Sequence, residues 1–247
     1  YVFHLAAVEQ AYQSDQDIIQ EYLINTASIL HFFTTAESQS SKPVLVFTSS
    51  ANLFLGNDNK PVSETDITRP RSLWSAHKLL AEEYIRITAQ DKEWPAIVLR
   101  LANLYGVAEG QSFSTVVMLN KVVKLAKETS QLTLFVNYQY YRDFLYIQDA
   151  VAALLLAGAV AAKSRGEYYI IGSGEAKTLE EIWHVIAEEI KTATGQDVTI
   201  NIDTQRPLKT QEMRHFVANS QAFSELTGWQ PQVKLQPGLK QTIQQVL

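Results

Sequence analysis

The chain has 247 residues, of which 46% are hydrophobic and 19% charged, which is the composition of an ordinary globular protein. A net charge of −5 argues against a general nucleic-acid binder, because such a protein needs a concentrated basic face. With no cysteine, disulfides and thiolate metal sites are excluded, and we expect no metal. No signal peptide is visible and no apolar run reaches the roughly 18 residues that span a membrane, so we expect a cytoplasmic protein without a membrane partner.

Short apolar runs alternate with helical patterns along the chain. Four runs are continuously apolar, which is typical of strands buried on both faces of a parallel sheet. They span residues 2–5, 44–47, 96–100 and 168–171. Apolar residues at helical spacing predict helices at 16–37, 74–90, 112–128, 149–162 and 178–194. This alternation favours an α/β fold with a mostly parallel sheet and helices on both faces.

Hydroxyl side chains end the second apolar run, at Thr48, Ser49 and Ser50. In open α/β sheets, ligands bind beyond the carboxyl ends of the strands, so these hydroxyls are placed to hydrogen-bond a substrate oxygen. Serines also end strands and begin turns in the absence of any ligand. The run alone does not decide between the two interpretations.

The stretch RSLWSAHKLLAEEY (71–84) places Lys78 one helical turn after Trp74, on the same side of the predicted helix. A tyrosine at position 74 would have its pKa lowered by the lysine, and could exchange a proton with a substrate hydroxyl while a cofactor took the hydride. Taken alone, Trp74 and Lys78 also fit a buried aromatic and a solvated charge.

Together these segments resemble the NAD-dependent epimerase/dehydratase family, the extended short-chain dehydrogenases. The resemblance covers nearly the whole chain in order. The matching segments are HLAA (4–7), Asn25 in EYLINT, VFTSSANLFLG (46–56), Trp74 with Lys78, LRLANLYG (99–106), YRDFLYIQDA (141–150), YYIIGSGEAKTLEEI (168–182) and LTGWQP (226–231).

The resemblance implies a site for NAD or NADP and a nucleotide-sugar substrate. In the family's YxxxK motif, Trp74 stands in the place of the catalytic tyrosine, Lys78 is the lysine and Ser50 is the catalytic hydroxyl. The implied cofactor-binding residues are His4, Leu5, Ala6, Ala7, Asn25, Thr48, Ser49, Lys78 and Leu101. The implied substrate-binding residues are Asn103, Arg142 and Arg206, with Arg214 as a further candidate for the diphosphate.

Two departures from the family pattern matter. The glycine-rich phosphate turn is absent, and the two strand–helix–strand units that carry it would need on the order of 60 residues before Tyr1. Either the sequence is a fragment that lacks the first strands, which we favour, or the native protein lacks half of the dinucleotide site, and the choice between NAD and NADP stays open. Trp74 cannot transfer the proton, and loss of a general acid or base costs roughly 10²–10⁴-fold in rate. His77 could carry the proton instead, or be a helix-surface histidine.

Ala51, Asn52 and Leu53 follow Ser50, where dehydratases and decarboxylases of the family carry an acidic residue. The resemblance therefore implies an NAD(P)-dependent nucleotide-sugar 4-epimerase or 4-keto reductase. The alternative is a catalytically impaired member that binds a dinucleotide or nucleotide sugar as a regulatory module. The sugar, the nucleotide and the direction of reaction stay open.

The resemblance also implies an organisation. Residues 1–106 would be the remainder of the dinucleotide-binding domain, and 107–247 a small substrate-binding region mixed with its last elements. A homodimer is expected through the helices at 16–37 and 74–90, with Leu30, Phe33, Leu80, Tyr84 and Ile87 as its apolar face. Asp149 is expected to cap the helix that follows it.

Overall fold

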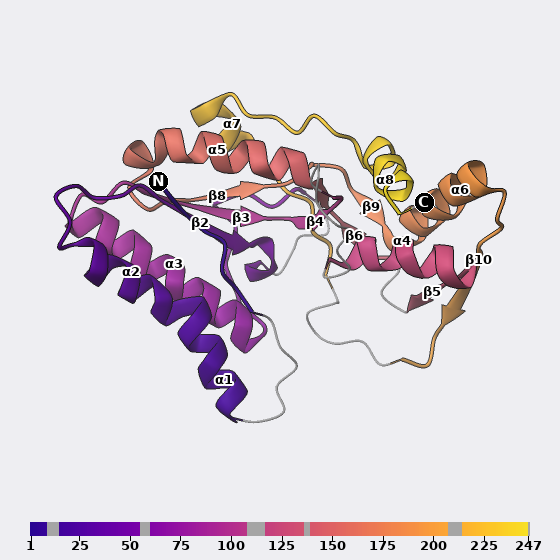
Figure 1. Cartoon of the computed structure of the whole chain (residues 1–247), viewed down its shortest axis with the longest axis horizontal. Helices are drawn as coiled ribbons and strands as arrows, with labels where there is room; N and C mark the ends of the chain where they lie inside the picture. The colour runs from indigo at the N-terminus through magenta and orange to yellow at the C-terminus, as the bar shows by residue number, and fades with distance from the viewer. Residues whose placement is uncertain (9–14, 55–59, 108–116, 136–138, 207–213, 247) are drawn as a thin grey trace.

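The computed structural model describes residues 1–8, 15–54, 60–107, 117–135, 139–206 and 214–246 (Figure 1). Its centre is a parallel sheet of strands in the order β1-β2-β3-β8. These strands span Val2–His4, Leu45–Ser50, Ala96–Leu101 and Tyr168–Ile171. The four apolar runs thus form the expected strands, within three residues at each end, and the mostly parallel α/β fold is confirmed.

Helices cover both faces of this sheet (Figure 1). On one face lie α2 (Ser28–Ala36) and α3 (Leu73–Asp91), and on the other α5 (Ile147–Ser164) and α7 (Gln221–Thr227). Strand β2 shows why its sequence is continuously apolar: Leu45 and Phe47 pack toward α2 and α3, whereas Val46 packs in the core on the opposite face. A strand that is buried on both sides has no polar alternation.

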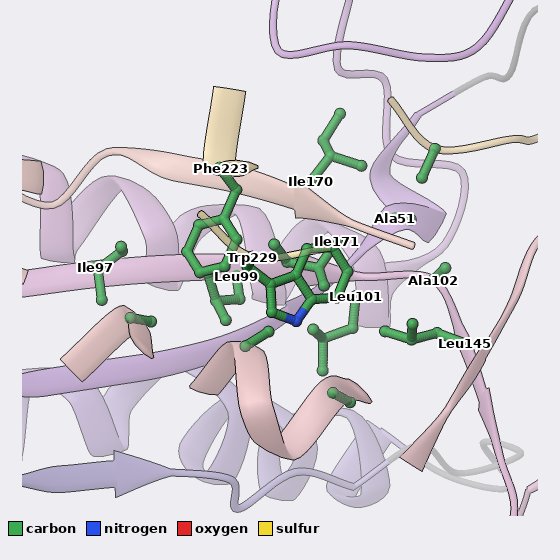
Figure 2. Close-up of a cluster of buried hydrophobic side chains, with 14 of the residues drawn as sticks. Ala51, Ile97, Leu99, Leu101, Ala102, Leu145, Ile170, Ile171, Phe223 and Trp229 are labelled. Carbon is green, nitrogen blue, oxygen red and sulfur yellow. The ribbon is translucent and has the colours of Figure 1, made fainter. Parts of the chain in front are cut away.

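The core beneath α5 joins distant parts of the chain. Leu99 and Ile170 from neighbouring strands meet Phe223 and Trp229 from the C-terminal segment (Figure 2). Alanines at positions 150, 153, 157 and 161 form the buried stripe of α5. In the described part of the chain, α5 is the one helix whose length and composition would let it cross a membrane.

The predicted helix at 16–37 is one helical run with a change of winding in the middle. It consists of α1 (Asp15–Tyr22), a π-helix η1 (Leu23–Ala27) and α2. Widened turns of this kind are frequent at functional sites. Here the widened turn carries Asn25 and Thr26, both fully buried.

A second core lies beside the sheet, around α4 (Met118–Thr129), α6 (Leu179–Thr194) and α8 (Leu235–Gln244). The predicted helices at 149–162 and 178–194 match α5 and α6 within two residues. Residues 112–116 of the predicted helix at 112–128 lie outside the described residues. The division at residues 106 and 107 stays a prediction.

Three short strand pairs, two isolated bridges and one 3₁₀ turn complete the described fold. The pairs are parallel β5 (Gln131–Phe135) with β10 (Thr199–Asp203), parallel β4 (Asn103–Tyr105) with β7 (Phe144–Tyr146), and antiparallel β6 (Tyr141–Arg142) with β9 (Lys177–Thr178). The isolated bridges join Val62 to Ala218 and Phe54 to Thr68. The 3₁₀ turn η2 (Ala51–Leu53) directly follows β2. It lies at the carboxyl edge of the sheet, where ligands bind in open α/β folds.

Candidate active site

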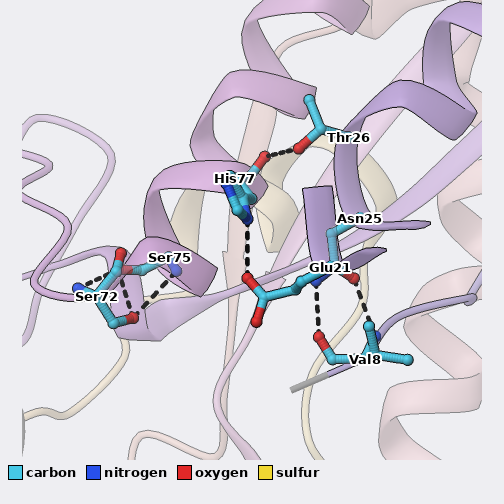
Figure 3. A network of polar contacts seen from close by, with 7 residues as sticks. All are labelled: Val8, Glu21, Asn25, Thr26, Ser72, Ser75 and His77. Atoms are coloured by element: carbon cyan, nitrogen blue, oxygen red, sulfur yellow. Dashed lines mark hydrogen bonds and ion pairs between the residues drawn. The ribbon is translucent and has the colours of Figure 1, made fainter. Parts of the chain in front are cut away.

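The start of α3 is fixed next to the carboxyl end of β2. Ser72 Oγ accepts from the Ser75 amide at 3.1 Å, and Ser75 Oγ accepts from the Ser72 amide at 3.0 Å (Figure 3). This reciprocal capping satisfies two amides that the first turn of a helix leaves without partners. It sets the register of α3, with Trp74 in the first turn and Lys78 one turn later.

Lys78 reaches down onto β2. Its side chain is 2% exposed, and Nζ lies 4.2 Å from the ring centre of Phe47. Burial lowers the pKa of Lys78 to about 8, and the Glu82 carboxylate one turn further on offsets part of that effect. In the described part of the chain, Nζ makes no hydrogen bond. The solvated charge that the sequence allowed is therefore wrong, because this ammonium is held inside the fold.

His4, the last residue of β1, presents a buried acceptor beside Lys78. Ser28 Oγ donates its own proton to the Ile24 carbonyl at 2.6 Å, so in its 3.2 Å contact with His4 we assign Nε2–H as the donor and Ser28 Oγ as the acceptor. Nδ1 is then an acceptor, and it is buried without a partner in the described residues. Burial, together with nearby Lys78, lowers the pKa of His4, which favours the neutral ring.

The three hydroxyls that end β2 behave differently. Thr48 donates to the His4 carbonyl at 3.2 Å and ties the end of β1 to β2. Ser49 Oγ is buried and approaches the Glu82 carboxylate without the geometry of a hydrogen bond. Ser50 Oγ accepts from the Asn52 amide at 3.1 Å, so its own proton is still available to a ligand.

Asn25 holds the chain that leaves β1. Its Oδ1 accepts from the Val8 amide at 3.0 Å, and its Nδ2 donates to the Val8 carbonyl at 2.7 Å (Figure 3). The segment Leu5–Ala7 between β1 and this clamp is exposed. Asn25 therefore positions the main chain of that segment, and both ends of its amide are used in doing so.

His77 turns toward α1, away from the position of a helix-surface residue. Its Nδ1 lies 2.8 Å from Oε1 of Glu21, a wholly buried carboxylate, and its carbonyl accepts from Thr26 Oγ1 at 2.8 Å (Figure 3). The surface alternative for His77 is therefore wrong. Its side chain joins α3 to α1, and a role in proton transfer stays a prediction.

Trp74 lines a small pocket of about 80 Å³ beside η2. The other residues that line it are Asn52, Phe54, Arg71, Ser72, Ser75 and Arg214. The indole Nε1 is a buried donor without an acceptor in the described residues. Position 74 thus faces a pocket and offers it a donor that cannot ionise.

The three predicted substrate residues do not lie together: Arg142 lies near the pocket, whereas Asn103 and Arg206 contact other parts of the chain. Arg142 is buried in β6, where it donates to the carbonyls of Tyr141 and Arg214, so it lies beside Arg214, one of the two arginines that line the pocket. Asn103 donates to the Asp143 carbonyl at 3.0 Å and supports the pairing of β4 with β7. Arg206 stacks on Phe135 at 4.5 Å and is not among the residues that line the pocket.

Two further expected residues are Leu101 and Asp149. The side chain of Leu101 packs in the core beneath α5, and its contact with the cofactor stays a prediction (Figure 2). Asp149 does not cap its own helix, whose first flanking residue is Tyr146. Its carboxylate accepts from the amides of Gln232 and Val233 at 3.0 and 2.9 Å, because the C-terminal segment crosses over the start of α5.

A buried ion pair lies behind the site, and sequence reasoning missed it. Arg100 in β3 donates to Glu82 of α3 at 2.6 Å, and its guanidinium stacks on Tyr168 at 3.5 Å. Both partners are almost fully buried. The signal was present, because an arginine inside the apolar run AIVLRL needs a buried partner.

The chain is similar in sequence to several known proteins. A family model described as GDP-mannose 4,6 dehydratase matches residues 1–242. A dTDP-4-dehydro-6-deoxyglucose reductase from Escherichia coli is 26% identical over 99% of this chain and 74% of the relative. A putative UDP-glucose 4-epimerase from Methanocaldococcus jannaschii is 25% identical over 98% of this chain and 75% of the relative.

Solved structures show the same fold. The Pseudomonas aeruginosa protein RMD, complexed with NADPH, matches with a TM-score of 0.82 at 19% identity, over 99% of this chain and 80% of that one. A Thermotoga maritima UDP-glucose 4-epimerase with UDP-glucose matches with a TM-score of 0.81 at 25% identity, over 99% of this chain and 76% of that one.

Proposed function

Because the chain belongs to the NAD-dependent epimerase/dehydratase family, the extended short-chain dehydrogenases, we propose that it is a nucleotide-sugar epimerase or 4-keto reductase. One observation carries the proposal. In the described residues, three buried side-chain polar atoms lack a partner, namely His4 Nδ1, Ser49 Oγ and Trp74 Nε1, and all three lie on the elements that form this edge of the sheet. Buried polar groups are normally hydrogen-bonded, so such a set marks a place where a ligand completes the bonding.

NAD or NADP fits the groups present at the ends of β1 and β2. The exposed main chain at residues 5–7, which Asn25 holds in place, would lie along the dinucleotide. Lys78 offers hydrogen-bond donors to ribose hydroxyls, and His4 Nδ1 offers an acceptor. When bound, the dinucleotide supplies hydride transfer at a sugar carbon.

The chain's own residues would bind and orient the sugar. Ser50 retains a donor for the hydroxyl or carbonyl oxygen at the reacting carbon. The side chains of Ala51, Asn52 and Leu53 bring no carboxylate to this turn, which supports epimerisation or reduction over water elimination. Trp74 offers the sugar an apolar ring surface and one N–H donor. The proton that is exchanged with the sugar oxygen during the reaction has to come from another group or from water.

Hydride transfer provides the direct test. The chain is mixed with NAD(P)H and 4-keto nucleotide sugars, or with NAD and nucleotide hexoses, and absorbance and product composition are followed. We expect turnover that Ser50→Ala reduces by about 10²-fold, in the range of one lost donor at a reacting oxygen. If the chain binds neither the cofactor nor any nucleotide sugar, the proposal is overturned.

Trp74 also supports a second function, that of a binding module without turnover. The residue lines the pocket with an aromatic ring that carries no ionisable phenol. Calorimetric titration separates the two functions. Tight binding of cofactor and sugar nucleotide without product formation supports the module, whereas steady turnover rules it out.

A homodimer through the helices at 16–37 and 74–90 is part of the proposal. Leu30, Leu80 and Ile87 are 39%, 37% and 47% exposed on α2 and α3, as an apolar contact surface requires. Phe33, expected on that surface, is 5% exposed and packs in the core instead. Light scattering should give twice the monomer mass, and Leu80→Lys with Ile87→Lys should give the monomer. A cytoplasmic location and the expected lack of metal, membrane and nucleic-acid partners stay predictions.

A further inference from the structure

We propose that Arg214 positions the hydroxyl of Ser50 by holding η2, the turn that directly follows this residue. The inference rests on the proposed function, in which Ser50 binds the oxygen at the reacting carbon, and it adds a positioning residue to that reaction. The contacts that carry it join two segments that lie 160 to 163 residues apart along the chain.

The guanidinium of Arg214 is engaged by the turn. Its Nη1 donates to the carbonyls of Ala51 and Phe54 at 3.1 and 2.9 Å, which uses both N–H groups of this nitrogen. Its Nη2 donates to Oδ1 of Asn52. A planar, forked cation holds several oxygens in one fixed arrangement, and hydrogen bonds from an ionised donor are stronger than neutral ones. Arg214 therefore holds η2 at its first residue, its middle residue and the residue that follows it.

Ser50 is tied to the same turn by its own side chain. Its Oγ accepts from the Asn52 amide at 3.1 Å, and the Phe54 amide closes the turn by donating to the Ala51 carbonyl at 3.2 Å. The residues that make these two bonds are the ones that Arg214 holds. Because the contact with Asn52 orients the Ser50 side chain, a shift of the turn would move the hydroxyl away from the oxygen that it has to bind.

The main chain on which Arg214 stands is itself anchored. The Phe216 amide donates to the Tyr141 carbonyl at 3.1 Å, and the Ala218 amide donates to the buried carboxylate of Asp143 at 2.9 Å. The guanidinium lies 5.3 Å from the centre of the Phe216 ring, and Arg214 is 8% exposed. A side chain that is packed and hydrogen-bonded in this way can hold a reacting group precisely.

A direct contact with the substrate is the competing role, because Arg214 also lines the pocket beside Trp74. An arginine that binds a diphosphate directs its forked donors at phosphate oxygens. In this structure three N–H groups of Arg214 are directed at the chain's own turn. The two roles differ in kinetics, since a positioning residue lowers the rate of the chemical step and a ligand contact lowers affinity.

A double-mutant cycle on the rate of hydride transfer separates these roles. Arg214→Met should lower kcat by about 10–100-fold, as expected when a reacting group is misplaced by about 1 Å, and should change KM by less than about threefold. In the Ser50→Ala background the same replacement should lower kcat by less than about threefold, because the group that it positions is already gone. Arg214→Lys keeps the charge without the fork and should restore only part of the rate.

Arg69→Met is the matched control. The Arg69 amide donates to the Leu53 carbonyl at 2.8 Å, so this residue adjoins the same turn, but its side chain is exposed and does not line the pocket. The main-chain bond survives the replacement. Arg69→Met should therefore leave kcat and KM unchanged.

Hydrogen exchange measured by NMR reports on the turn without any substrate. The amides of Asn52 and Phe54 should exchange at least about tenfold faster in Arg214→Met than in the wild-type chain, and at the wild-type rate in Arg69→Met. Unchanged exchange at both amides would show that Arg214 does not hold the turn.

The remaining outcomes are equally decisive. Equal losses of kcat with and without Ser50 would show that Arg214 does not act through this hydroxyl. Weaker binding of UDP or of the nucleotide sugar by Arg214→Met in the Ser50→Ala background would assign the arginine to the ligand. If the wild-type chain shows no turnover, the proposed function fails, and the exchange rates alone decide whether Arg214 holds the turn. Asn52→Ala removes an acceptor from the other end of the contact and should lower kcat only when Ser50 is present, which keeps the test valid if Arg214→Met does not fold.

Discussion

The ammonium of Lys78 lies 4.2 Å from the centre of the Phe47 ring, so a charged side chain of α3 packs against the apolar strand β2. A cation over an aromatic face is attracted by the ring, but only by about 0.5–2 kcal/mol. That is less than the cost of removing an ammonium from water, which is why burial dominates the pKa of Lys78. A charge held in this way is expected where a ligand contributes the remaining contacts.

The first prediction concerns the pH dependence of stability. The pKa of Lys78 is about 8 in the folded chain against 10.5 in the unfolded chain, so between these values the unfolded state binds more protons. This group's contribution to stability therefore rises as pH increases from 8 to 10.5. Lys78→Met should be more stable than wild type at pH 7, by on the order of 3 kcal/mol, with the difference vanishing near pH 10.5. Urea unfolding at both pH values measures it, and a constant difference would contradict the assignment.

The second prediction concerns Arg100 and Glu82. Arg100→Met leaves a buried carboxylate without its partner, and should destabilise the chain by about 3–5 kcal/mol. The double replacement by Arg100→Met and Glu82→Met should cost clearly less, because no unpaired charge remains. Denaturant unfolding of the two single variants and the double variant gives the coupling energy. Additive effects would show that the two residues stabilise the chain independently.

These residues also show how far sequence reasoning reached. The four buried strands and the helices between them followed from periodicity, because a strand buried on both sides leaves a recognisable run. The partner of Arg100 could not be derived with the same ease, because Glu82 comes from another element and only the fold brings the two together. Asp149 was expected to cap its own helix because local capping is the commonest role of such a residue. In the structure its carboxylate accepts instead from the amide of Gln232, which lies 83 residues further along the chain.

In the candidate site, sequence placed Lys78 and the hydroxyl run but left their contacts open. The clamp between Asn25 and Val8 joins two segments through main-chain atoms, which no side-chain pattern records. Likewise, the contact of His77 with Glu21 depends on how α1 packs against α3. Spacing within one helix predicts which side a residue faces, but not which element lies on that side.

The third prediction concerns Asn25. Asn25→Ala removes both hydrogen bonds to Val8 and leaves partly buried main-chain groups without these partners, which costs about 1–3 kcal/mol. Because the exposed segment 5–7 then loses its anchor, NADH and NADPH should bind at least tenfold more weakly. Fluorescence titration of the reduced cofactor measures this. Thr34→Ala is the control, since Thr34 bonds only within α2 and should leave affinity unchanged.

The last prediction concerns Trp74 itself. Trp74→Tyr places a phenol one helical turn before Lys78, whose charge favours the phenolate and so lowers the pKa of the new side chain. If the wild-type chain lacks a general acid or base, this change should raise the rate of hydride transfer by about 10²–10⁴-fold without a comparable change in substrate affinity. Trp74→Phe is the matched control, because it has the ring without the ionisable group and should show no gain. Stopped-flow absorbance at saturating cofactor and nucleotide sugar separates the chemical step from binding. A tyrosine variant that binds both ligands as wild type does, yet turns over no faster than the phenylalanine variant, would show that position 74 is not where the proton is transferred.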